Sequence, residues 1–209
     1  MLGSLRRQQG TSLVELMVSM SIGFVSLTAM ASLVGHGIGL NAQLMAKSRL
    51  YEEVNGIAHL LQSEIKRHGY YADMSKVILA PNEQANPFKA LLAVSQYRDE
   101  AGQSCILFAY DRNNNGQLDT DDGNEHFGFR LKDQAIEIRI DGLDCDSPGW
   151  HDLSDPQVVK ITELSFNLRP IVLDGITVYQ VSLMLRAELT VDSVISQQIS
   201  HSFYLRNYG

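Results

Sequence analysis

The stretch DRNNNGQLDTDD, residues 111–122, carries oxygen-bearing side chains at nearly alternating positions. They match positions 1, 3, 5, 9 and 12 of a twelve-residue calcium loop, with a backbone carbonyl at position 7 and a glycine, Gly116, for the sharp turn at position 6. Hard cations such as Ca²⁺ take oxygen ligands of this kind. The predicted ligands are Asp111, Asn113, Asn115, the carbonyl of Gln117, Asp119 and Asp122.

A structural turn is the alternative for these residues. Asn115-Gly116 is by itself a strong hairpin signal. The flanking segments are strand-like rather than helical, and Asp122 stands where calcium loops usually have the longer glutamate. The sequence requires no cofactor, and calcium is the one ion for which it offers a set of ligands.

The sequence contains no recognisable catalytic motif. The six histidines are scattered, and the chain has no GxSxG, HExxH, Walker or GxGxxG pattern. The formal charge is −7, and no basic and aromatic face of the kind that binds nucleic acid is present. We therefore expect neither an enzyme nor a nucleic-acid-binding protein.

One acid, Glu15, stands near the start of a long apolar segment. Between residues 11 and 40 only Glu15 and His36 can ionise, and a helix needs about 20 apolar residues to cross a bilayer. An ionised acid near the hydrocarbon costs about 2 to 4 kcal/mol, so a partner is expected for it. Arg6 and Arg7 precede the segment without any acid, which predicts a cytoplasmic N-terminal end and an exported body.

A cleavable secretory signal is an alternative for this segment. Ala29-Met30-Ala31 fits the small-x-small pattern of a cleavage site. However, that interpretation leaves Glu15 inside the apolar core without a role, and it does not account for the helical pattern that continues downstream.

A one-sided apolar pattern follows the apolar segment. It predicts an amphipathic helix that packs on the protein's own sheet. The glycines of GHGIG, residues 35–39, predict a kink or soft point, because each costs about 1 kcal/mol relative to alanine, and Gly69 predicts the end of the helix. The predicted stripe is Leu40, Leu44, Tyr51, Val54, Ala58, Leu61 and Ile65.

The rest of the chain alternates between strand-like segments and turns. Its strand-like segments are rich in β-branched and aromatic residues. One of them has two distinct faces, and the helix is expected to cover one of the two. The two faces are Ile176, Val178, Gln180, Ser182 and Met184 on one side and Thr177, Tyr179, Val181, Leu183 and Leu185 on the other. The predicted strands are residues 104–110, 125–131, 135–140, 158–168, 175–189 and 193–207.

The N-terminal segment resembles the signal of type IV prepilins and type II secretion pseudopilins. A short basic leader ends in Gly10, and Ser12, two apolar residues, Glu15 and a long apolar helix follow. In those families a membrane aspartyl peptidase cuts after the glycine and methylates the new N-terminus. The resemblance implies cleavage between Gly10 and Thr11, methylation of Thr11 and an assembly role for Glu15. Thr11 departs from the family pattern, which usually has phenylalanine there.

Cleavage would give Glu15 a partner. The new ammonium group of Thr11 can be neutralised by the carboxylate of a neighbouring subunit, and buried charges are tolerated chiefly when they are paired. Such a pair favours one stagger between adjacent helices.

The C-terminal part resembles minor pilins of the PilW type, through ITELSFNL, a long hairpin and a terminal FYLRN. CILFAYDRNNNGQLD, GFRL and DCDSPGW are similar to the prepilin-peptidase-dependent protein B branch. The resemblance implies an α+β type IV pilin fold, in which a long N-terminal helix packs on an antiparallel β-sheet head. The expected parts are a leader at 1–10, a transmembrane half of the helix at 11–36, an amphipathic half at 37–69 and a periplasmic head at 70–209.

Minor pilins of this kind are low-abundance subunits that help to start pilus assembly and are thought to lie at the tip. The resemblance implies a single-pass inner-membrane protein that enters a cell-surface pilus. Its expected partners are a prepilin peptidase, other minor pilins, the major pilin and the inner-membrane assembly platform. Two alternatives stay open: a minor pseudopilin of a type II secretion system, and a calcium-binding or adhesive tip module.

The two cysteines, Cys105 and Cys145, both lie in the part predicted to be exported. An oxidising periplasm favours a disulfide over two free thiols, and closing a loop of this length contributes roughly 4 kcal/mol in the chain-entropy model. The absence of a CxxC pattern argues against a metal or redox role. We expect the bond to hold residues 144–150 against the first strand of the head.

Overall fold

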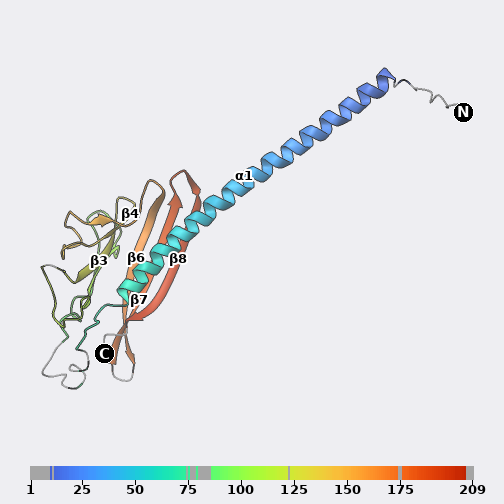
Figure 1. Cartoon of the computed structure of the whole chain (residues 1–209). Coiled ribbons are helices and arrows are strands. Elements are labelled where there is room, and N and C mark those ends of the chain that lie inside the picture. The colour runs from blue at the N-terminus through green and yellow to red at the C-terminus, as the bar shows by residue number, and fades with distance from the viewer. Residues whose placement is uncertain are drawn as a thin grey trace, which may run out of the picture. The chain divides into compact units, whose positions relative to one another are not determined.

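The computed structural model describes residues 10, 12–73, 75, 79, 86–121, 123–173 and 176–205. Within these residues one long helix precedes eight strands (Figure 1). The chain forms two compact units, residues 1–46 and 47–209, and the helix contributes to both. The elements are α1 (Leu13–Ile65), β1 (Ala93–Ser95), β2 (Cys105–Ala109), β3 (His126–Lys132), β4 (Ala135–Ile138), β5 (His151–Asp152), β6 (Val159–Leu173), β7 (Ile176–Leu189) and β8 (Asp192–Leu205).

Within the second unit, α1 buries one stripe of side chains. Leu50, Val54 and Leu61 are at most 1% exposed. Intervals of three and four residues bring such side chains onto one face of a helix. The full stripe is Leu50, Val54, Ile57, Ala58, Leu61 and Ile65.

The stripe predicted from the sequence is wrong at three positions. Leu40, Leu44 and Tyr51 are 62%, 66% and 53% exposed, and Leu50 and Ile57 are buried instead. One residue corresponds to about 100° of rotation about the helix axis, so Tyr51 points away from the face that Leu50 buries. Spacing alone does not show where along a helix burial begins.

The end of α1 follows the predicted signals closely. The helix continues through residues 35–39, so the three glycines do not break it. It ends at Ile65, and turns follow as far as Gly69, whose φ of 73° lies in the left-handed region. The Gly69 N–H then donates to the Ala109 carbonyl at 3.0 Å, which joins the end of the helix segment to β2.

Strands β6, β7 and β8 form one antiparallel sheet in chain order. The face of β7 that carries Val181, Leu183 and Leu185 is the buried one. The head part of α1 lies across this sheet (Figure 1). The rings of His59 on α1 and His201 on β8 are 5.1 Å apart.

Strands β1 to β5 form a second antiparallel sheet, also in chain order. In β3, a Cβ atom at Gly128 would lie 2.7 Å from the Ile106 carbonyl of β2, so the pairing of these strands requires glycine. The neighbouring core is aromatic: the stacked rings of Tyr110 and Phe127 are 4.2 Å apart, and Phe108 packs beside both. The short strands β1 and β5 were not predicted.

The head therefore has two antiparallel sheets rather than one, and turns connect them. The Phe166 N–H of β6 donates to the Gln103 carbonyl, and the Ile161 N–H to the Gln134 carbonyl, both at 2.9 Å. Gln103 and Gln134 have positive φ values of 68° and 66°. Because turn residues rather than a strand face β6, a continuous ladder does not form. A long N-terminal helix packed on antiparallel sheets is the α+β type IV pilin fold that the sequence predicted.

Candidate processing and assembly segment

The predicted cleavage site lies directly before α1. Gly10 and Ser12 are exposed, whereas residues 1–9 and Thr11 lie outside the described residues. A Cβ atom added at Gly10 would meet nothing within 4 Å. A larger side chain at Gly10 would therefore not clash with the chain itself. If glycine is required at this position, the requirement comes from a molecule that binds this segment.

Glu15 lies in the first turn of α1. The Ser12 carbonyl accepts a hydrogen bond from the Leu16 N–H at 3.1 Å, and the spacing of Ser12 and Glu15 is that of a capping box. An acid in this turn gains about 0.3 to 1 kcal/mol from the helix dipole. That gain is smaller than the roughly 2 to 4 kcal/mol that an acid costs near hydrocarbon, so starting the helix does not by itself account for Glu15.

Four hydroxyl side chains of the apolar segment bond within the helix. Each donates to a carbonyl one turn earlier, at 2.7 to 2.9 Å. His36 Nδ1 lies 2.8 Å from the Ser32 carbonyl and donates to it if that nitrogen carries the proton. Polar groups that are satisfied inside their own helix can enter a hydrocarbon environment at little cost. The hydroxyl donors are Ser19, Ser21, Ser26 and Thr28.

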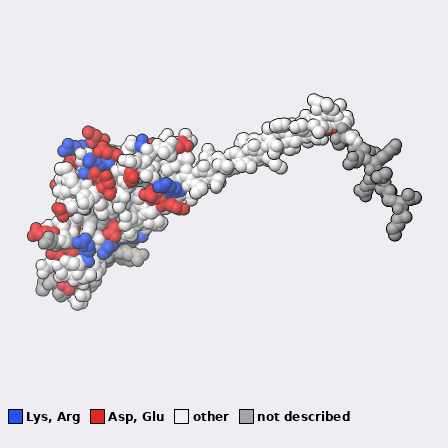
Figure 2. Space-filling model, turned by 45° about the horizontal axis from the view of Figure 1, so that its top comes forward, with Lys and Arg blue, Asp and Glu red and all other residues white. Residues whose placement is uncertain are grey.

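The large apolar side chains of residues 13–45 have no cover within their own unit. Each is more than half exposed. One window of α1 is long and apolar enough to span a membrane, with a mean hydropathy of 1.8, and none of it is buried. Figure 2 shows no blue side chains along this apolar part, whereas groups of blue and red side chains are scattered over the second unit. Such a surface needs an apolar environment supplied by lipid or by other helices.

The predicted calcium-loop residues are brought together only in part. The side-chain nitrogens of Asn113 and Asn115 both donate to Asp119 Oδ2, at 2.7 and 2.8 Å. Asp111 Oδ2 accepts the Gly116 N–H at 3.0 Å. The Gln117 N–H donates to Asn115 Oδ1 at 2.7 Å, and Asp122 lies outside the described residues. No three His, Cys, Asp or Glu side chains in the described part of the chain are placed to hold a metal ion, so a cation here would need asparagine and backbone oxygens as well.

Two family models match the chain. The model described as prepilin peptidase-dependent protein B matches residues 43–205, and the prokaryotic N-terminal methylation motif matches residues 5–31. The chain belongs to the prepilin peptidase-dependent protein B family. Among curated proteins, prepilin peptidase-dependent protein B of Escherichia coli (strain K12) is 23% identical over 161 residues, which cover 74% of this chain and 75% of that protein. No solved structure gives a significant match.

The two matches cover the two parts of this family member that the sequence singled out. The methylation motif includes Gly10, Thr11 and Glu15, and the family match includes the second half of α1 and the head. The chain is therefore a pilin-like protein with an N-terminal methylation motif and an apolar N-terminal helix.

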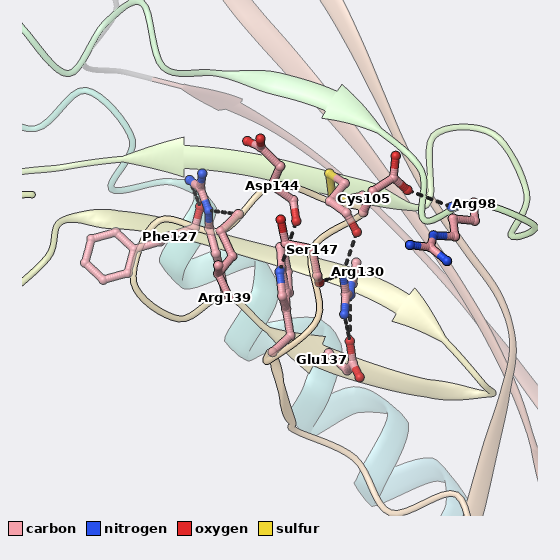
Figure 3. The surroundings of a disulfide bond; sticks show 12 residues. Arg98, Cys105, Phe127, Arg130, Glu137, Arg139, Asp144 and Ser147 are labelled. Carbon is pink, nitrogen blue, oxygen red and sulfur yellow. Dashed lines mark hydrogen bonds and ion pairs between the residues drawn. A yellow bond between two sulfur atoms is a disulfide. The ribbon is translucent and has the colours of Figure 1, made fainter.

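The structure links Cys105 of β2 to Cys145, 40 residues later, by a disulfide. Beside this bond lies Arg130 of β3, which is fully buried. Figure 3 shows Arg130 between Glu137 and the segment that carries Ser147. Its Nε donates to Glu137 Oε2 at 2.6 Å, and its Nη1 donates to the carbonyls of Cys145 and Ser147. The disulfide and Arg130 therefore attach the same loop to the sheet.

Two buried charged residues, Arg130 and Glu125, were not predicted from the sequence. The alternation of residues in the Arg130 strand predicts only that one side of the strand is buried. The side chains that enclose Arg130 are Glu137, Tyr97 and Trp150, and they come from other parts of the chain. The ring centres of Tyr97 and Trp150 lie 4.6 and 4.5 Å from its guanidinium carbon. Glu125 lies three residues beyond the predicted calcium motif, where a search for the fixed spacing does not look.

Proposed function

We propose that this protein is a minor pilin-like subunit that helps to start assembly of a type IV pilus and lies at the pilus tip. A prepilin peptidase cuts the chain after Gly10, and α1 anchors it in the inner membrane. The observation that carries the proposal is the methylation motif over residues 5–31, on a segment that leads into an uncovered apolar helix. The name of the Escherichia coli relative supports dependence on a prepilin peptidase.

Cleavage after Gly10 gives Glu15 a charge partner. Two opposite charges about 4 Å apart attract by about 4 kcal/mol at an effective dielectric constant near 20. This is enough to offset the roughly 2 to 4 kcal/mol cost of an acid at the edge of the hydrocarbon. A Glu15 carboxylate set against the Thr11 ammonium of a neighbouring subunit therefore stabilises one axial position of the two helices, and other positions leave both charges unpaired.

The proposed location follows from the same segment. Arg6 and Arg7 keep the leader in the cytoplasm, and the head is then exported to the periplasm. The Cys105–Cys145 disulfide supports an oxidising compartment for the head. The partners are the prepilin peptidase, other minor pilins, the major pilin and the inner-membrane assembly platform. The role in the filament is structural.

Processing is tested by mass spectrometry of the membrane fraction. The mature chain should begin with N-methylated Thr11, and Gly10→Val should leave the full-length precursor. Gly3→Val, a matched change elsewhere in the leader, should be processed normally. An N-terminus after Ala31 would show that the segment is a secretory signal and would refute the pilin assignment.

Assembly is tested with two changes of the acid, Glu15→Val and Glu15→Gln. Both variants should be cut and should reach normal membrane levels, because Glu15 lies outside the scissile bond. Both should lower the number of sheared surface pili, since glutamine keeps the shape but not the charge. Wild-type pilus numbers with Glu15→Gln would show that charge pairing is not the role of this residue.

Deletion of the gene distinguishes a pilus from a secretion system. Loss of surface pili, together with detection of the wild-type protein in sheared pili at a low ratio to the major subunit, supports the proposal. Normal pili with loss of exported enzymes from the medium would establish the pseudopilin alternative instead.

A further inference from the structure

Asp111 has a buried carboxylate oxygen without a hydrogen-bond partner. The residue is 0% exposed. Its Oδ2 accepts the N–H groups of Ala72, at 3.1 Å, and Gly116, at 3.0 Å, whereas Oδ1 is buried and has no partner among the described residues. An unsatisfied oxygen of a buried carboxylate is costly. The Gly116 hydrogen bond holds the carboxylate against the turn of the loop, and Oδ1 is left for a further partner.

A second carboxylate, Glu125, is buried at the base of the same loop. It is 0% exposed. Its Oε1 accepts the N–H groups of Arg112, at 2.6 Å, and Asn113, at 3.3 Å, and its Oε2 accepts the Asp119 N–H at 3.2 Å. Glu125 therefore fixes both arms of the loop through backbone hydrogen bonds.

The loop concentrates negative charge, and its one basic side chain, Arg112, lies 5.9 Å from the centre of the Phe127 ring. Asp111, Asp119 and Glu125 lie within fifteen residues of chain, and none of the ion pairs formed by the described residues involves them. Buried charges are tolerated chiefly when they are paired or bind a metal. A bound cation would supply the missing opposite charge.

Asn113, Asn115 and Asp119 are joined by side-chain hydrogen bonds within the loop. Asn113 and Asn115 both point their amide groups at Asp119 Oδ2. Asn113 Oδ1 accepts the Asn115 N–H at 2.9 Å, and Asn115 Oδ1 accepts the Gln117 N–H at 2.7 Å, so both amide oxygens lie inside the turn. Each of these oxygens has a second lone pair that a cation can use. Gly116, with a φ of 73°, makes the sharp turn that a calcium loop needs at its sixth position.

We propose that residues 111–125 bind Ca²⁺. The ligands are Asp111 Oδ1, the side-chain oxygens of Asn113 and Asn115, the Gln117 carbonyl and Asp119, and Glu125 holds the loop closed from outside the ligand set. Ca²⁺ accepts six to eight oxygens in flexible geometry, whereas Mg²⁺ demands a near-ideal octahedron and keeps several waters. With two charged ligands in a mixed set, we expect a dissociation constant of about 10⁻⁴ to 10⁻³ M, as in extracellular modules. This site does not depend on the proposed pilus function.

Terbium luminescence tests binding directly, with the full-length protein in detergent micelles. The Tyr70 hydroxyl donates to Asn114 Oδ1 at 2.9 Å, and the Tyr71 ring lies 3.5 Å from where a Cβ of Gly116 would be. Both tyrosines are therefore close enough to transfer excitation to Tb³⁺ in the loop. We expect sensitised emission that excess Ca²⁺ removes. No sensitised emission would refute the site.

Thermal unfolding gives a second, independent measurement. Ca²⁺ at about ten times its dissociation constant should raise the melting temperature by about 3 °C relative to chelator, and the same Mg²⁺ concentration should raise it by less than half as much. Equal shifts with the two ions, or no shift with Ca²⁺, would overturn the proposal.

Matched variants locate the ion. Asp111→Asn keeps one oxygen for the Ala72 and Gly116 N–H groups but replaces the other, and it should abolish the calcium shift. Asp119→Asn should do the same and serves if Asp111→Asn does not fold. Asp121→Asn, an exposed acid of the same loop outside the ligand set, should keep the full shift. Loss of the shift with Asp121→Asn, or its retention with Asp119→Asn, would contradict the assigned ligands.

Discussion

At the scale of the residue, Arg130 shows how one buried charge can hold several segments together. Its Nη2 lies 2.6 Å from Glu137 Oε2, and the side chains of Arg130 and Glu137 are 0% and 7% exposed. Lys132 Nζ, 3.5 Å from Glu137 Oε1, is more exposed and is the weaker partner. A pair of this kind is weak evidence for stability, but removal of one member leaves an uncompensated buried charge.

We therefore predict that Arg130→Met lowers the free energy of unfolding by about 3 to 5 kcal/mol. The double variant Arg130→Met with Glu137→Met should be less destabilised than Arg130→Met alone, because no buried charge is left over. Urea denaturation followed by circular dichroism measures both. Arg169→Met, a change at an exposed arginine, should have little effect on the unfolding free energy. The explanation would be contradicted if the double variant lost as much unfolding free energy as Arg130→Met and Glu137→Met lose together.

His68 makes the stability of the head sensitive to acid. Burial lowers its pKa from 6.5 to about 4, and hydrogen bonds to the backbone of Ala109 and Lys89 oppose this only in part. Between these values the unfolded chain binds a proton that the folded chain excludes. His68 therefore contributes its full stability above pH 6.5 and loses it as the pH falls to about 4. The pKa values of His126 and His201 are also lowered, chiefly by burial, which gives the same sign.

The expected loss from His68 is about 3 kcal/mol of unfolding free energy across this pH range. Urea denaturation at a series of pH values should show it, and His68→Gln should flatten the profile. His151→Gln, at an exposed histidine, should leave the profile unchanged. A profile that keeps its slope with His68→Gln would assign the acid sensitivity to other groups.

At the scale of the element, α1 has two environments along one continuous helix. Its first part exposes apolar side chains on all sides, whereas its last part buries a single stripe that ends at Ile65. Continuous exposure suits lipid or neighbouring helices, and a single stripe suits a sheet. The surroundings of a helix, rather than its intrinsic helix propensity, determine which of its side chains can be changed without loss of unfolding free energy.

Two adjacent leucines of α1 test this distinction. Leu61 is 0% exposed and Leu60 is 40% exposed. Leu61→Ala should lower the unfolding free energy by about 2 to 5 kcal/mol, because it leaves a cavity under the helix, and Leu60→Ala should lower it by much less. Denaturation of both variants under identical conditions measures the difference. Similar losses at the two positions would mean that the assigned face of the helix is wrong.

At the scale of the whole molecule, the disulfide encloses much of the five-stranded sheet. The segment between Cys105 and Cys145, which are 40 positions apart, includes β3, β4 and the loop of residues 111–125. A bond across a loop of this length stabilises the fold chiefly by restricting the unfolded chain, typically by about 2 to 4 kcal/mol. It therefore acts on the whole head rather than on one contact.

We predict that Cys145→Ser lowers the unfolding free energy by about 2 to 4 kcal/mol. A reducing agent should produce the same loss in the wild-type protein and no further loss in the variant. Thiol labelling of the protein in intact cells should find no reactive cysteine until reductant is added. Labelling without reductant would show that the bond is not formed in the cell.

The sequence by itself determined the features that depend on neighbours in the chain. Ser12 and Glu15 mark the start of α1 because a capping signal is complete within four residues. Each of the six predicted strand segments contains or overlaps a strand, because alternation and turn residues are local signals. The methylation motif and the apolar helix were recognisable for the same reason, and the family model over residues 5–31 supports the motif.

Only the tertiary structure decided which surfaces of those elements meet. It showed that Leu50 and Ile57, rather than Tyr51, belong to the buried stripe, and that turns at Gln103 and Gln134 divide the head into two sheets. It also placed two charged side chains in the interior, Arg130 beside the disulfide and Glu125 under the loop. Burial is decided by segments far apart in the chain, and periodicity within one segment carries no information about its partner.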